Sequence, residues 1–540
     1  MTAETSIVTG NLITMDPSRP RADAMGIVAG RIASVGTESE VRSVLPGTAK
    51  AWRFASGAVL PGFIDSHNHM LATGTQQYLV DLSTCRRIAD ILDAVRDYAV
   101  RNPDRLWVVA GQGWHIDSLE ERRYPTRWEL DAVCPDRPVY LPRIYHAAAC
   151  NSRALAMGGI DCSVRDPLGG KIVRDDGGQL TGELHEAPAM RLVERLIPPL
   201  ARTERLDALR TIQQRYLKAG ICGVIDPGLR SEEISLYEEL WTSGELKVRT
   251  VVMPLAETGG DVEATLERFA SWPIRTGFGD ARLKVGGIKV FLDGGASLGT
   301  ALMRQPYKDR KCGCGIQVTP TDSFRRIVEF CASSGWSLGV HTVGGRAIDI
   351  ALEVFASVAR RFDIRRLRFS IIHAYLWPTP GNIETARTLG VAIATQPSMQ
   401  YQFAPVLLRK GFSQESVARA TPLRSWLDGG VIVAGGSDAP ATPYQPMLGI
   451  WHAVTRHIDS LGEALGADQA ISAEEALVLY TRNAAWLSFS DHERGMLKPG
   501  LEADWIALSV DPLNADKQKL KSADVRATAI AGEVLHQDCA

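Results

Sequence analysis

The chain has 540 residues, of which 45% are hydrophobic and 23% charged, a composition typical of a folded protein with a large apolar core. Its 60 Lys and Arg residues nearly balance its 62 Asp and Glu residues, which leaves no broad positive field for binding nucleic acid. No apolar run approaches the roughly 20 residues that span a bilayer, and residues 1–20 lack the basic and apolar regions of a secretion signal. Nine scattered cysteines do not resemble a disulfide framework. We therefore expect a cytoplasmic protein with neither a nucleic-acid nor a membrane partner.

Short strand-like runs occupy both ends of the chain. At the N-terminal end they are separated by residues typical of hairpin turns, at Gly10–Asn11 and Gly30–Arg31. Isolated hairpins are only marginally stable, so we expect the two ends to pair with each other. The sequence predicts a composite β-sandwich domain built from residues 1–59 and 493–540.

The middle of the chain alternates strand-like runs with helical patterns, as in parallel sheets covered by helices. Eight runs read as strands: 57–67, 220–227, 247–254, 282–293, 336–343, 368–375, 390–397 and 430–438. Helical periodicity fills residues 205–220, 322–335 and 345–362. This alternation predicts an α/β fold, a (β/α)8 barrel over residues 60–492 with its chemistry at the carboxyl ends of the strands. Residues 71–204 contain further strand-like runs and are interpreted as a subdomain inserted near the barrel mouth.

Two histidines follow the first predicted barrel strand, in the sequence PGFIDSHNHM. Side chains two positions apart on a strand share a face, so His67 and His69 can enter the barrel mouth together. Neutral imidazole is a good ligand for zinc and similar divalent ions. A single H-x-H pattern fits a structural role equally well.

Three further candidates close predicted strands: His341, His373 and Asp438. The chain has only 11 histidines, and four at strand ends of one barrel favour a shared metal site. The alternative is a cluster of hydrogen-bonded histidines without metal.

Lys289 lies inside the predicted strand 282–293, where alternation places it opposite the aliphatic side chains. If those pack against helices, Lys289 points into the barrel, where burial lowers the pKa of a lysine. A neutral amine can react with carbon dioxide to give a carbamate, whose two oxygens suit a bridge between two metal ions. The alternative is an ion pair with Asp293 or Asp438.

In this order, PGFIDSHNH, the strand with Lys289, VHTVGGRAID, the strand ending in His373, and GGSDAP resemble the metal-dependent amidohydrolase superfamily. Further segments resemble those of its YtcJ-like branch, which includes N-substituted formamide deformylase. These segments are AGQGWHID, RIYHAAACNSRAL, LDGGASLGTAL and SAEEALVLYTRNAA. The resemblance spans nearly the whole chain, including the β-sandwich split between the termini.

This resemblance implies the roles of the candidate residues. His67 and His69 would hold the more buried metal, the carbamate of Lys289 would bridge, and His341 and His373 would hold a second metal. Asp438 would bind metal and act as the general base. The implied cofactor is a divalent metal, zinc in the first instance, as one or two ions. Relatives often form dimers, which leaves a homodimer open.

Substrate contacts are expected in the inserted subdomain. By the resemblance, His146 would donate a hydrogen bond to a substrate carbonyl, while Trp114 and Tyr145 could form an apolar wall; ordinary packing is the alternative for all three. The chain departs from the branch pattern at Ile372 and His115, where relatives commonly carry acids. We therefore do not expect this chain to share the specificity of those relatives for a substrate amine.

We expect a hydrolase that cleaves a C–N amide-type bond of a small molecule by metal-activated water, with Asp438 as the catalytic base. The leading substrate class is an N-acyl or N-formyl amine or a cyclic amide. One alternative is an ester or lactone hydrolase or a lyase on the same metal site. Another is a scaffold without catalytic activity.

Overall fold

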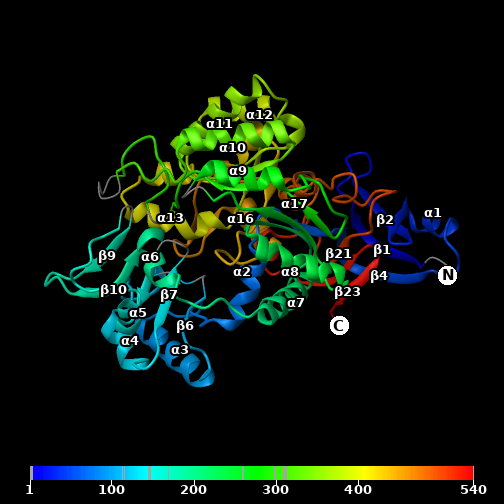
Figure 1. The fold of residues 1–540 in the computed structure, drawn as a ribbon. Coiled ribbons are helices and arrows are strands. Elements are labelled where there is room, and N and C mark those ends of the chain that lie inside the picture. Colours follow the sequence, from blue (N-terminus) through cyan, green and yellow to red (C-terminus); the bar gives the residue numbers. More distant parts are fainter. Residues whose placement is uncertain are drawn as a thin grey trace. The chain divides into compact units, whose positions relative to one another are not determined.

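A computed structural model of the chain describes residues 4–111, 114, 116–143, 147–167, 170–257, 261–296, 299–307 and 313–538. The chain divides into two compact units. One contains Met1–Met70 and Arg210–Ala540, and the other contains Leu71–Leu209. Figure 1 shows the elements in chain order.

Strands from both ends of the chain form one seven-stranded sheet, in the order β23-β22-β21-β4-β1-β2-β3. The strands are β1 (Thr5–Ile13), β2 (Arg21–Val28), β3 (Arg31–Gly36), β4 (Lys50–Pro61), β21 (Trp505–Leu508), β22 (Val525–Ile530) and β23 (Glu533–Gln537). The two ends meet where β4 pairs antiparallel with β21, with Leu60 opposite Ile506. Alternate side chains of these strands, among them Val8, Val59 and Trp505, form a buried core on one face.

One predicted turn in this sheet is confirmed and the other is wrong. Ala29 and Gly30 both have positive φ and connect β2 to β3 as a two-residue hairpin. Gly10 and Asn11 instead lie inside β1, where the register of pairing shifts. The shift against β2 lies between Thr9 and Leu12, and that against β4 lies between Gly10 and Leu12. A glycine inside a strand marks such a bulge as readily as a turn.

The remaining strands of this unit that bear on the site run parallel in two sheets. The first has the order β13-β12-β11-β5, and the second has the order β14-β15-β16-β17-β18. Their bounds are β5 (Phe63–Asp65), β11 (Ile221–Leu229), β12 (Arg249–Pro254), β13 (Leu283–Val285), β14 (Ile288–Phe291), β15 (Leu338–Thr342), β16 (Ser370–His373), β17 (Ala392–Thr395) and β18 (Val433–Gly435). Each of these strands lies within one of the eight predicted runs, with one exception. The last two residues of β11, Gly228 and Leu229, lie beyond the predicted run 220–227.

The predicted strand 282–293 is two strands, not one. Gly286 donates its backbone N–H to Val252 of β12, whereas Ile288 donates to Ser337, which precedes β15. A Cβ at Gly287 would lie 2.7 Å from the carbonyl carbon of Ser337. The glycine pair therefore lets the chain leave one sheet and join the other.

Backbone hydrogen bonds connect the two sheets beside this break and also next to their outer strands, β5 and β18. Ala256, after β12, donates to the carbonyl of Lys289 in β14 at 2.8 Å. Ser66, after β5, donates to the carbonyl of Gly435 in β18 at 3.1 Å.

Helices follow most of the parallel strands. They are α7 (Arg202–Lys218), α8 (Ser231–Thr242), α9 (Val262–Ser271), α10 (Thr321–Ser334), α11 (Gly345–Ala359), α12 (Pro380–Leu389), α13 (Met399–Arg409), α14 (Gln414–Ala418), α15 (Leu423–Asp428), α16 (Pro446–Thr455), α17 (Ala473–Tyr480) and α18 (Arg482–Leu487). In α10 the buried residues Phe324, Ile327, Val328 and Cys331 recur every three or four positions, and Gly335 ends the helix with a left-handed conformation. Helices α9, α10, α11 and α12 pack in chain order (Figure 1). Shorter elements of this unit are α1 (Glu38–Ser43), α19 (Lys517–Leu520), β19 (His457–Ile458) and β20 (Glu463–Ala464). Helix α2 (Met70–Thr75) begins at Met70, and its other residues belong to the second unit.

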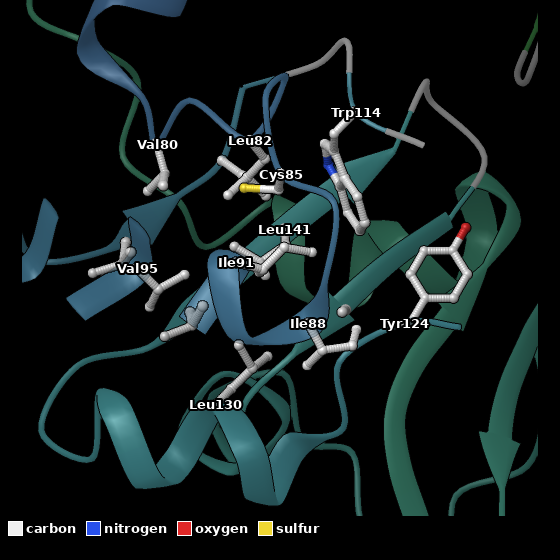
Figure 2. Packing of buried hydrophobic residues seen from close by; sticks show 14 of the residues in the cluster. Val80, Leu82, Cys85, Ile88, Ile91, Val95, Trp114, Tyr124, Leu130 and Leu141 are labelled. Atoms are coloured by element: carbon white, nitrogen blue, oxygen red, sulfur yellow. The ribbon is translucent and has the colours of Figure 1, made fainter. Parts of the chain in front are cut away.

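The second unit has its own sheet and core. Its sheet has the order β6-β7-β8-β10-β9, from β6 (Val108–Val109), β7 (Val139–Arg143), β8 (Ala147–Cys150), β9 (Lys171–Arg174) and β10 (Leu180–His185). Its helices are α3 (Ile88–Arg101), α4 (Arg127–Val133), α5 (Ser152–Met157) and α6 (Glu186–Glu194). Figure 2 shows Ile88, Ile91 and Val95 of α3 in one apolar cluster with Leu130 and Leu141.

Across the described part of the chain, none of the helices combines the length and the apolar character needed to cross a bilayer.

Candidate metal centre

Except for Lys289, the predicted metal ligands lie at or beyond the carboxyl ends of parallel strands. His67 and His69 follow β5, Lys289 lies in β14, His341 in β15, and His373 ends β16. Asp438 lies three residues after β18. In α/β proteins with parallel strands this edge is where functional side chains gather.

Three of these residues converge on one point. His67 Nε2 lies 3.3 Å from Asp438 Oδ1, and His69 Nε2 lies 3.2 Å from the same oxygen. Their ligand atoms form a group within 4.8 Å of one another. His67 is 1% exposed, so water does not compete for its ring.

This donor set fits a divalent metal. Two imidazole nitrogens and a carboxylate oxygen are common zinc ligands, which bind at about 2.0–2.2 Å. Ligands at that distance around a tetrahedral ion are roughly 3.3 Å apart, from the same bond lengths. The observed separations of 3.2 and 3.3 Å match this value.

The other two histidines continue the same cluster of rings. The ring centroids of His67 and His373 are 5.2 Å apart, and those of His373 and His341 are 4.5 Å apart. Four imidazoles from three strand ends therefore line one buried region. The structure brings together all four histidines predicted as metal ligands.

Lys289 shares this region. Its side chain is buried, with Nζ 4.8 Å from the centroid of Phe291, whose ring in turn lies against His341. Burial lowers the pKa of this amine to about 7, against the opposing effect of the Asp438 charge. The alternative partner Asp293 is engaged elsewhere, since it accepts backbone N–H groups from Leu302, Val343 and Gly344.

Burial also sets the charges of the other groups. Desolvation lowers the pKa of His67 and of His373 to about 3, so both rings are neutral near pH 7. Burial alone would raise the pKa of Asp438, but hydrogen bonds from His67 and His69 outweigh it and hold this pKa well below the usual value. Neutral imidazoles and an ionised carboxylate are the forms that coordinate a cation.

A hydrogen-bond network based on Asp65 fixes the two loops that carry these ligands. One oxygen of Asp65 accepts the backbone N–H groups of Ser437 at 2.9 Å and His67 at 3.3 Å. The other accepts the Ser437 hydroxyl at 2.6 Å and the Asn68 amide at 2.9 Å. Ser437 precedes Asp438, so one buried carboxylate ties the His67 loop to the Asp438 loop.

The backbone at two ligands is itself unusual. His373 has φ of 79° and Asp438 has φ of 59°, in the left-handed region that residues with a Cβ rarely adopt. Such conformations persist where the surroundings fix them, and they concentrate at functional sites.

Several residues that support the ligands were not predicted from the sequence, which left Gln396 open between a supporting and a purely structural role and did not single out Tyr375 or Asp226. Tyr375 and Gln396 hydrogen-bond with His373 Nδ1, at 3.1 and 2.8 Å. Asp226 Oδ1 lies 4.0 Å from His69 Nδ1, and its other oxygen accepts the Tyr237 hydroxyl. The sequence shows polar residues at the ends of apolar strands, but it does not show which side chains they contact.

The predicted substrate contacts belong to the second unit. Tyr145, His146 and also His115 lie outside the described residues. Trp114 is buried in the core of that unit, where its indole donates to the Pro142 carbonyl at 2.8 Å and its ring packs edge-on against Tyr124 (Figure 2). Packing accounts for this residue, and its role in substrate binding stays a prediction.

The departure at Ile372 has a clear location. Ile372 is 2% exposed and belongs to a buried apolar cluster that includes Ile64 of β5, Ile225 of β11 and Met253 of β12. An apolar side chain suits this core, where an unpaired carboxylate would be costly to bury. Arg368, at the opposite end of β16, pairs with Asp491 and is structural.

Comparisons with known proteins agree with this arrangement. A family model described as "Amidohydrolase family" matches residues 56–536. The protein YtcJ of Bacillus subtilis (strain 168) is 29% identical over 539 residues, 98% of each chain. N-substituted formamide deformylase of Arthrobacter pascens is 29% identical over 541 residues, also 98% of each chain.

Among solved structures, an uncharacterized metal-dependent hydrolase from Pyrococcus horikoshii OT3 superposes with a TM-score of 0.77. It is 23% identical, and the match covers 95% of this chain and 99% of the other. At this identity the likeness concerns the fold.

Proposed function

Since the chain belongs to the amidohydrolase family, we propose that it is a metal-dependent hydrolase that cleaves a C–N amide-type bond of a small molecule. The observation that carries the proposal is the convergence of His67 Nε2 and His69 Nε2 on one oxygen of Asp438. We propose an N-acyl or N-formyl amine, or a cyclic amide, as the substrate class. The similarity to N-substituted formamide deformylase supports this choice.

The proposal includes a closed (β/α)8 barrel made from the two parallel sheets. In this barrel β13 and β14 are the two halves of one strand. The hydrogen bond from Ala256 to Lys289 supports closure because it joins the sheets beside the β13–β14 junction, and that from Ser66 to Gly435 because it joins them next to their outer strands, β5 and β18. A closed barrel would bring the carboxyl ends of all its strands to one rim. Residues 71–204 would then be an insertion after the first barrel strand.

The proposed metal ligands are the residues with the required donor atoms. His67, His69 and Asp438 would hold one divalent ion, for which zinc is our first choice. His341 and His373 would hold a second ion. When bound, such a metal lowers the pKa of water toward neutrality and polarises the scissile carbonyl.

Asp438 is the proposed catalytic base. Its pKa lies well below the usual value, so it is ionised near neutral pH and can accept a proton from the attacking water. It would return that proton to the leaving nitrogen as the C–N bond breaks. Its backbone, fixed through Ser437 and Asp65, holds the carboxylate in place for both transfers.

Lys289 is the proposed bridging residue. With a pKa of about 7, its amine is substantially neutral at physiological pH. The Nζ lone pair can bond to the carbon of carbon dioxide with loss of one proton, which gives a carbamate anion. Burial beside Phe291 and the histidines protects this group from bulk water.

Substrate positioning remains with the second unit in this proposal. His146 would donate to the substrate carbonyl, and Trp114 and Tyr145 would contact an apolar substituent.

The test uses protein purified without chelator, assayed for bound metal and for turnover of matched amide and ester substrates. We expect at least one equivalent of metal and amide hydrolysis that is lost in His69→Asn. The control His492→Asn changes an exposed histidine and should retain both metal and activity. Exclusive ester turnover would instead support an esterase or lactonase, and less than about half an equivalent of metal would support a scaffold without catalytic activity.

A further inference from the structure

His373 has a hydrogen-bonding environment that distinguishes its two ring nitrogens. Its Nδ1 lies 2.8 Å from Gln396 Oε1 and 3.1 Å from the Tyr375 hydroxyl. The Tyr375 hydroxyl also donates to Gln396 Oε1. All three side chains are buried, Gln396 completely.

The orientation of the Gln396 amide follows from its surroundings. Gln396 Nε2 lies 3.4 Å from the carbonyl oxygen of Ala394, which can only accept. The amide nitrogen must therefore face Ala394, and Oε1 faces Tyr375 and His373. Reversing the amide would set two carbonyl oxygens against each other in a buried region, at a cost of roughly 1–3 kcal/mol.

This orientation assigns the proton on His373. A carbonyl oxygen is an acceptor, so the Nδ1 that contacts Gln396 Oε1 must carry the hydrogen. A neutral imidazole carries a hydrogen on only one of its two nitrogens. Its other nitrogen, Nε2, is then the one with a free lone pair, in a ring that lies between those of His67 and His341.

We propose that Tyr375 and Gln396 are positioning residues that hold His373 in the Nδ1–H tautomer and so leave Nε2 free to bind a metal. Metal-binding histidines are commonly held in this way by an acceptor on the second nitrogen, and loss of that acceptor typically weakens metal binding 10- to 100-fold. The metal part of this inference rests on the proposed function. The tautomer is a property of the metal-free protein.

Further contacts show that the arrangement is fixed on both sides. The Thr395 hydroxyl donates to the His373 carbonyl at 2.9 Å, which holds the strained backbone of His373 against the neighbouring strand β17. The Tyr375 ring packs against Phe403 of α13, with centroids 5.3 Å apart. The hydroxyl of Tyr375 is thereby directed by packing as well as by its hydrogen bonds.

The experiment measures both the tautomer of His373 and the affinity of the protein for zinc. Metal-free protein labelled with 15N-histidine is analysed by long-range 1H–15N correlation, with the His373 signals assigned from a His373→Gln variant. Zinc dissociation constants are then measured by competition with a chelating dye. The variants are Gln396→Met, which removes the acceptor, Gln396→Glu, which keeps one, and Tyr375→Phe.

We expect His373 in the wild-type protein to carry its hydrogen on Nδ1. In Gln396→Met the Nε2–H form should appear and zinc binding should weaken 10- to 100-fold. Gln396→Glu should retain the Nδ1–H form, and Tyr375→Phe should retain it with a smaller loss of affinity. If Gln396→Met does not fold, the tautomer of the wild-type protein is the test, and loss of the Nδ1–H form in Gln396→Glu, which keeps the acceptor, would contradict the inference.

Gln213→Met is the matched control. Gln213 is equally buried and bonds with Glu245, Lys247 and Val248, so its loss should lower stability without changing the His373 tautomer or zinc affinity. An Nε2–H form in the wild-type protein, or an unchanged tautomer in Gln396→Met, would overturn the inference. A wild-type Nδ1–H form in a protein that binds no zinc would confirm the tautomer assignment and refute the proposed metal site instead.

Discussion

Lys289 should destabilise the metal-free protein, because its amine is buried. The pKa of this lysine is lowered from 10.5 to about 7. At about 1.4 kcal/mol for each pH unit, this corresponds to roughly 5 kcal/mol of unfavourable free energy below pH 7, and roughly 3 kcal/mol at pH 8. Lys289→Met replaces the amine with an unbranched apolar side chain of similar size.

The expected result is that Lys289→Met raises the free energy of unfolding by roughly 3 kcal/mol at pH 8 while removing hydrolytic activity. The sign follows from proton binding. Between pH 7 and 10.5 the unfolded chain holds a proton on this lysine that the folded protein has lost, so wild-type stability rises with pH in this window. The advantage of the variant should therefore be largest at pH 6 and vanish near pH 10.5.

Urea unfolding of chelator-treated protein in degassed buffer, at pH 6, 8 and 9.5, measures this difference. Lys521→Met is the control, because the Lys521 amine is at an exposed position and pairs with Asp459 at 2.8 Å, so its removal should not stabilise the fold. Equal or lower stability of Lys289→Met at pH 6 would show that the buried amine is not a destabilising group, and would refute the reasoning.

Three further substitutions test other parts of the account. Asp438→Asn should leave metal largely bound and lower kcat by at least about a hundredfold, and unchanged turnover excludes it as the base. Asp504→Ala removes one of the two carboxylates that pair with the buried Arg249 guanidinium, leaving Glu502, and should lower the free energy of unfolding by about 1–3 kcal/mol in urea titrations. Arg326→Ala, at an exposed pair, should change it by less than about 1 kcal/mol. His146→Ala should raise KM or lower kcat with normal metal content; a drop in bound metal would make His146 a ligand.

The sequence could predict the elements that position the site, because each has a local signature. The parallel strands are continuous runs of aliphatic residues, and the helix over 321–334 shows buried positions at helical spacing and a glycine at its end. His67 and His69 stand two apart after a strand, and His341, His373 and Asp438 each close one. Their meeting at one place then follows from the parallel arrangement of the strands.

Other features depend on contacts between distant segments and have no local signature. The break at Gly286–Gly287 exists because Ser337 approaches the backbone there, 50 positions away in the chain. The left-handed backbone of His373 and the pairing of its ring with Gln396 depend on the adjoining strand β17. Periodicity shows which residues are buried but not which partners they have.

Anomalous X-ray scattering from crystals of protein purified without chelator tests the central claim most directly. The account predicts an anomalous peak, strongest above the absorption edge of the bound metal, in contact with His67, His69 and Asp438. A peak bound by other residues, or none in crystals of protein that hydrolyses amides, would contradict it.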